Sequence, residues 1–156
     1  MNTFTRHTYP GDVPVVPPAG VLPLSRLRLA AEVFFCFAVG GMGYYLLEVL
    51  FRGYSHPSMA LAGGLCFLLL YALDARLPRT PLPLRALGGA LVITAVEFAV
   101  GVVVNLWLGL DVWDYSAYRL SLLGQICLPF TGLWFLVCIP AMAVCRLLRR
   151  RVFTRR

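Results

Sequence analysis

The sequence predicts an all-α, polytopic membrane protein in which four transmembrane helices form a bundle. Of its 156 residues, 60% are hydrophobic and only 13% are charged, whereas a soluble domain of this length carries about 25% charged residues. Four long apolar runs divide the chain, and its arginines are distributed unevenly beside them. Lipid is therefore the predicted solvent for most of the chain.

The chain is predicted to contain two tails and one membrane domain. Residues 1–27 hold five prolines and are expected to form an extended cytoplasmic tail. Residues 28–148 are the predicted four-span domain, and residues 149–156 an Arg-rich cytoplasmic tail. The predicted spans are about 29–51, 57–73, 86–110 and 121–145. The second is close to the lower length limit for crossing a bilayer, and Pro129 and Pro140 are expected to bend the fourth.

Arginine placement predicts the orientation of the bundle. All fourteen basic residues are Arg, and four crossings would put twelve of them on the side of both termini, leaving Arg52 and Arg119 on the other. Cytoplasmic segments carry the excess of positive charge. Both termini are therefore predicted inside, in a bacterial cytoplasmic (inner) membrane. Nucleic acid is not an expected partner, because basic and aromatic residues do not interleave along a soluble face.

Small residues and cysteines suggest how the helices pack. Glycine pairs at 40–41, 63–64 and 88–89 are expected to let helix backbones approach closely. The five cysteines lie within or beside apolar runs without metal-ligand spacing, so they are interpreted as small buried hydrophobes. No metal and no cofactor is predicted. The cysteines are Cys36, Cys66, Cys127, Cys138 and Cys145.

Three glutamates within the spans are candidates for function, because an ionisable group in a membrane is costly and needs a partner. Glu32 is interpreted as an interfacial carboxylate near a cation. Glu48 has Arg52 four residues later, and either a simple ion pair or the border of a site fits this spacing. Glu97 falls near the middle of its span. Its role is either structural, as a hydrogen-bond hub between helices or a carboxyl kept neutral by its surroundings, or functional, in handling a ligand, ion or proton. The functional role predicts that Glu97→Gln abolishes function while the protein still accumulates.

Helical rise indicates which polar groups could meet. Glu97 would lie roughly 20 Å, and Glu48 about 5 Å, below the outer end of its span, so the two are not a paired-carboxylate site. We expect a polar pocket that opens outward, with Glu97 and Thr131 on its floor. Its mouth would hold Arg52, Glu48, Asn105 and Gln125, because both amides lie at about the level of Glu48. The outer loop would close over the pocket. The predicted pocket residues are Glu48, Arg52, Glu97, Asn105, Asp114, Gln125 and Thr131; no catalytic residue is assigned.

Four short motifs occur in order between about residues 33 and 140: Glu48-Val-Leu-Phe-Arg52, Glu97-Phe-Ala-Val-Gly101, Trp113-Asp-Tyr-Ser116 and Leu123-Gly-Gln-Ile-Cys-Leu128. Together they resemble the putative ABC-transporter type IV family, the CmpB-like permeases of bacteria. Two departures from the family pattern, at residues 56–63 and at Gln125, indicate a short subgroup. The resemblance implies a permease-like protein. The chain has no P-loop, so any ATPase would be another chain.

Three functions fit these observations. The first is a transporter-type or accessory membrane component whose substrate the sequence does not specify. The second is a membrane-embedded enzyme that acts on a lipid with Glu97 or Asp114 as general acid or base, although no nucleophile–base pair is visible. The third is a structural or regulatory membrane subunit without its own ligand. The expected partners are the lipid bilayer and either a second copy of the chain or a partner membrane or ATPase subunit.

Overall fold

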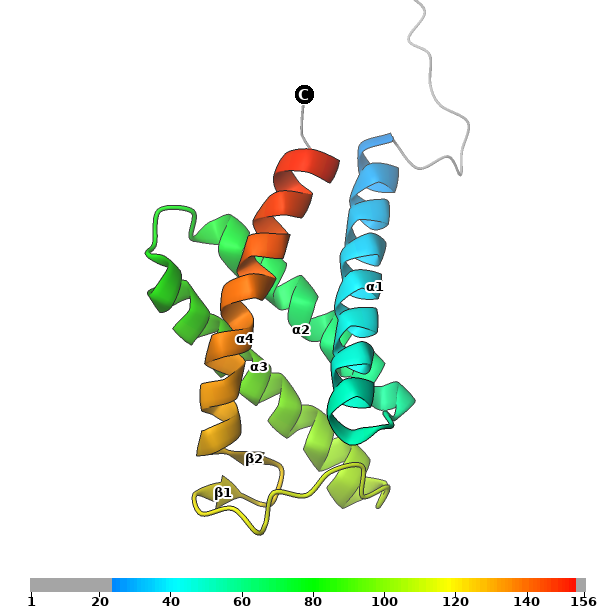
Figure 1. The fold of residues 1–156 in the computed structure, drawn as a ribbon. Helices are drawn as coiled ribbons and strands as arrows, with labels where there is room; N and C mark the ends of the chain where they lie inside the picture. Colours follow the sequence, from blue (N-terminus) through cyan, green and yellow to red (C-terminus); the bar gives the residue numbers. More distant parts are fainter. Residues whose placement is uncertain (1–23, 154–156) are drawn as a thin grey trace, which may run out of the picture.

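A computed structural model describes residues 24–153 and confirms an all-α bundle of four helices (Figure 1). The helices are α1 (Leu24–Arg52), α2 (Pro57–Arg76), α3 (Leu82–Gly101) and α4 (Leu128–Leu147). Two π-helical segments, η1 (Val102–Trp107) and η2 (Leu148–Val152), continue α3 and α4. Each of the four resulting helical segments is long and apolar enough to cross a membrane.

Most helix ends differ by several residues from the predicted spans, and residues 149–152, predicted to belong to a tail, continue α4 as part of η2. Residues 24–27 belong to α1 rather than to an extended tail; the rest of the predicted proline-rich tail, residues 1–23, lies outside the described residues. The fourth helix begins at Leu128 instead of Ser121. Residues 121–127 form a small antiparallel hairpin in which β1 (Ser121–Leu122) pairs with β2 (Ile126–Cys127).

Backbone conformation explains why the last helix starts late. Leu123 and Gly124, at the tip of the hairpin, have φ values of 51° and 70°, a left-handed conformation that a helix cannot contain. Pro129 lies in the first turn of α4, where a missing N–H costs no helix hydrogen bond. It therefore starts the helix. Pro140 lies inside α4, and a bend there stays a prediction.

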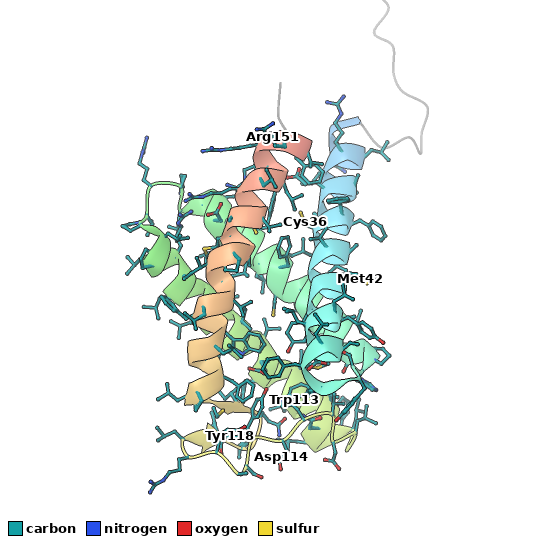
Figure 2. The ribbon with its side chains drawn as sticks, in the orientation of Figure 1. Cys36, Met42, Trp113, Asp114, Tyr118 and Arg151 are labelled. Atoms are coloured by element: carbon teal, nitrogen blue, oxygen red, sulfur yellow. The ribbon has the colours of Figure 1, made fainter. Side chains whose placement is uncertain are left out.

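All loops lie at one of two ends of the bundle (Figure 1). The start of α1, the α2–α3 connection and the end of α4 share one end, here called the arginine end. The α1–α2 connection and the segment of residues 108–127 share the other, here called the loop end. Figure 2 shows Arg151 at the arginine end and Trp113, Asp114 and Tyr118 at the loop end. The arginines, which are unevenly distributed along the sequence, thus lie mainly at one end of the fold.

Glycines allow α1 and α2 to pack closely, as predicted. A Cβ atom added at Gly40 would overlap the Cβ of Phe67, and one added at Gly63 would overlap the Cβ of Tyr44. Neither overlap could be relieved without moving a helix. A Cβ added at Gly43, by contrast, would have no atom within 4 Å, because that face of α1 is open. One face of α1 therefore packs closely on α2, while the face that carries Gly43 is uncovered.

The core lies mainly between α2, α3 and α4. All five cysteines are unpaired, and four of them are buried, in agreement with their interpretation as small hydrophobes. Many outward side chains are apolar and exposed, including Leu50 at 82% and Phe51 at 85%, as expected for a surface that faces lipid. The buried core residues include Phe67, Leu70, Ala90, Ile93, Cys138 and Met142.

Candidate functional site

The last turn of α1 carries an ion pair that is joined to the long loop. Arg52 Nη2 lies 3.0 Å from Glu48 Oε1, and the two side chains are 29% and 12% exposed. Ser55 Oγ donates to Glu48 Oε2 at 2.8 Å, while Arg52 Nη1 donates to the carbonyl of Val112 at 3.3 Å. The pair thereby ties α1 to the segment that connects α3 to α4.

A buried amide network closes the loop end of the bundle. Asn105, on η1, donates through Nδ2 to Gln125 Oε1 at 2.8 Å and to the Trp113 carbonyl at 2.9 Å. Its Oδ1 accepts the N–H of Val112 at 2.8 Å, and Trp113 Nε1 donates to the Gln125 carbonyl at 3.0 Å. A Cβ at Gly101 would lie 2.5 Å from Gln125 Oε1. This network holds residues 112–125 against α3, and within it the two amides bond each other.

Glu97 is buried in the middle of the bundle, with 6% of its surface exposed. Trp134 Nε1 donates to its Oε2 at 2.8 Å, and the hydroxyl of Tyr115 donates to its Oε1 at 3.0 Å. Burial, together with the nearby Glu97 carboxylate, raises the pKa of Tyr115, so this phenol keeps its proton. Each carboxylate oxygen of Glu97 therefore accepts a hydrogen bond from one aromatic side chain, one on α4 and one on the loop.

The other two predicted pocket residues lie apart from this centre. Thr131 Oγ1 accepts from Thr94 Oγ1 at 3.1 Å and donates to the Cys127 carbonyl at 3.2 Å, which joins α3 to α4. Asp114 is exposed on the loop, where it accepts from the N–H and hydroxyl of Ser116 at 2.8 and 2.7 Å. These two bonds hold the pKa of Asp114 below its usual value.

Two adjoining cavities lie between α1 and α4. Over the described residues α1 packs extensively on α2 and much less on α4, and the side chains of Tyr44 and Trp134 meet across the gap with ring centroids 5.7 Å apart. The larger cavity, about 350 Å³, is lined by glycines and apolar side chains of mid-span. The smaller, about 210 Å³, lies nearer the loop end. Because both are lined by Tyr44, Leu47, Trp134 and Val137, we treat them as one feature, the α1–α4 cleft.

The cleft contains only part of the predicted pocket. Glu48 and Arg52 line its smaller cavity together with the rings of Trp113 and Tyr115. Glu97 lies behind Trp134 and Tyr115 and contacts a separate space of only about 20 Å³. Asn105 and Gln125 satisfy each other within the buried network. The structure thus groups the seven predicted residues into a rim pair, a buried hub, a buried amide network and two outlying side chains, beside a cleft that is largely apolar.

One charged cluster was missed by the sequence analysis. Asp74, near the end of α2, is 1% exposed and is bonded by the equally buried Arg85 of α3. Arg146 Nε and Arg149 Nη2 also reach Asp74, at 3.3 and 3.1 Å. The sequence does contain a signal for this cluster, a lone aspartate among arginines, but Asp74 lies just beyond the predicted span 57–73.

Among residues 24–153, no group of three His, Cys, Asp or Glu side chains is placed to hold a metal ion. What the described residues do provide is a polytopic membrane bundle with a cleft of ligand size between two helices. A family model described as "Putative ABC-transporter type IV" matches residues 30–155. The chain belongs to this family. No curated protein and no solved structure matched the chain.

Proposed function

We propose that this protein is a transporter-type or accessory membrane component that binds a small amphiphile in the α1–α4 cleft. The observation that carries the proposal is the cleft itself, with cavities of about 350 and 210 Å³. Ligand sites typically measure about 300–1,000 Å³ and combine an apolar lining with a few polar groups. The family match supports a transporter-type role.

The lining indicates the chemistry of the ligand. The larger cavity is walled by apolar side chains such as Val39, Phe67 and Val144, which suit a hydrocarbon chain. The smaller cavity adds the charged side chains of Glu48 and Arg52 at its rim, which suit a polar head. A molecule with an apolar tail and a polar head would therefore satisfy both cavities, and it could enter from the bilayer between α1 and α4.

Gly43→Phe should block the cleft without disturbing the fold, because Gly43 lines the larger cavity and has open space beyond its Cα. The probe is palmitic acid carrying a photoreactive diazirine, added to purified protein in phosphatidylcholine nanodiscs. We expect crosslinking to fall about tenfold, which corresponds to about 1.4 kcal/mol of binding free energy.

Gly132→Phe is the matched control, since Gly132 on α4 is exposed, also has no atom within 4 Å of an added Cβ, and lines neither cavity. It should crosslink like the wild type. Equal crosslinking in wild type and both variants would reject the cleft as the binding site.

The proposed orientation places the arginine end in the cytoplasm of a bacterium. Nine described arginines lie at that end, and only Arg52 and Arg119 at the other. Alkaline phosphatase, which is active only after export, should be inactive when fused after Arg79 and active when fused after Ala117. The reverse pattern would invert the bundle, and activity at both positions would refute four crossings.

The proposed assembly includes at least one further chain. Four helices enclose little volume, and α1 leaves most of its apolar surface uncovered in the described structure. A second copy or a partner membrane or ATPase subunit would cover part of that surface. An ATPase subunit would also supply the energy for transport.

A further inference from the structure

A second groove lies at the arginine end, on the face of α4 opposite the α1–α4 cleft. Its volume is about 350 Å³. The apolar wall is formed by Leu82 at the start of α3 and by Ile139, Met142, Ala143 and Leu147 of α4. Three guanidinium groups, those of Arg146, Arg150 and Arg151, complete the lining. The groove thus combines a hydrocarbon surface with a cluster of cations at one end of a transmembrane helix.

Positive charge predominates among the described residues at this end. Among the described residues, nine arginines share the arginine end with two carboxylates, Glu32 and Asp74. Glu32 accepts a hydrogen bond from Tyr71, and Asp74 already interacts with three arginines. The described residues at this end therefore carry a net positive charge, which attracts anionic headgroups at the membrane surface.

Asp74 also positions part of the groove. Its carboxylate holds Arg146 through Nε at 3.3 Å, yet the Arg146 side chain stays 41% exposed. The same carboxylate holds Arg149, whose guanidinium carbon lies 5.0 Å from the centre of the Tyr71 ring. Anchoring one guanidinium in this way lowers the conformational entropy that it would lose on binding a ligand.

We infer that this groove binds an anionic phospholipid. The headgroup phosphate would lie against Arg146, Arg150 and Arg151, and one acyl chain would follow Leu82, Ile139 and Met142. Guanidinium groups bind phosphate through paired hydrogen bonds, and basic pockets beside transmembrane helices suit anionic headgroups at the membrane surface. This site is independent of the amphiphile proposed for the cleft, because the two use opposite faces of α4.

Native mass spectrometry of the purified full chain can test the inference. The protein would be titrated with dioleoylphosphatidylglycerol, with dioleoylphosphatidylcholine and with inorganic phosphate. We expect the wild type to prefer phosphatidylglycerol over phosphatidylcholine by roughly tenfold, and inorganic phosphate not to compete at equal concentration because it lacks the acyl chains. Equal affinity for the two lipids, or full competition by phosphate, would overturn the assignment of a phospholipid.

Two double variants distinguish lipid binding in this groove from general electrostatic attraction of lipid to the arginine end. Arg150→Gln/Arg151→Gln removes two groove cations, and Arg76→Gln/Arg79→Gln removes the same charge from exposed positions at the same end that do not line the groove. Only the first should lose the preference for phosphatidylglycerol. An equal loss in both would contradict a local site.

Ala143→Phe tests the position of the acyl chain. This substitution keeps every charge but fills the groove, so it should weaken the binding of both lipids. Unchanged binding in this variant would refute the acyl-chain position.

Discussion

Asp74→Asn is expected to destabilise the bundle by about 3–5 kcal/mol, because it leaves the buried Arg85 guanidinium without its counter-ion. Arg85 is 2% exposed and lies on α3, whereas Asp74 lies on α2, so the loss would also loosen the contact between these helices. The measurement is the melting temperature of the purified protein in detergent, followed by tryptophan fluorescence.

Asp111→Asn is the matched control for this prediction. Asp111 is exposed at the loop end, and asparagine tolerates its positive φ of 46°, so its melting temperature should stay near that of the wild type. The double variant Asp74→Leu/Arg85→Met replaces both buried charges with apolar groups and should recover most of the lost stability. If Asp74→Asn melted like Asp111→Asn, the buried pair would contribute nothing to the fold.

Glu97→Leu is expected to lower both stability and probe binding, whereas Glu97→Gln should preserve both. Leucine would leave the Trp134 indole N–H and the Tyr115 hydroxyl without their acceptor, at about 1–3 kcal/mol for each orphaned group. Glutamine can accept from Trp134 through its oxygen and donate to Tyr115 through its amide, since a phenol oxygen also accepts hydrogen bonds. Melting temperature and diazirine-palmitate crosslinking would be measured on both variants.

This comparison decides between the two roles that the sequence left open for Glu97. The geometry favours a hub that holds two rings of the cleft wall. If Glu97→Gln folded like the wild type but lost probe binding, binding would require the carboxyl group itself. A purely structural role would then not explain why a glutamate lies in the membrane.

The number of helices could be predicted because apolar length alone determines it. Their ends depend on interactions that a hydropathy pattern does not contain. The predicted second span stopped at Leu73, before two charged residues, yet α2 continues to Arg76 because Asp74 is neutralised by arginines from other helices. The predicted fourth span included residues 121–127 because they are largely apolar. The left-handed backbone at Leu123 and Gly124 and the pairing of β1 with β2 exclude them from the helix.

The sequence singled out individual polar residues but did not show how they are arranged. The position of Glu97 within an apolar run indicated that it needs partners, and its carboxylate accepts hydrogen bonds from Tyr115 and Trp134. Depth along each helix also placed Asn105 at the level of Gln125, and the two are bonded. Depth says nothing about rotation around the helix axis, so the sequence could not show that these amides face each other instead of a cavity. Nor could it show that a cleft separates α1 from α4.

The most direct test of the account is to map where diazirine-palmitate attaches to the wild-type protein in nanodiscs, by peptide mass spectrometry. An amphiphile held in the α1–α4 cleft should label the facing positions Leu47 on α1 and Val137 on α4 well above the outward positions Leu50, Leu91 and Leu136. Excess unlabelled palmitate should abolish that enrichment. Uniform labelling of all outward and cleft residues, insensitive to the competitor, would show that the probe reports only bulk lipid and that the cleft holds no ligand.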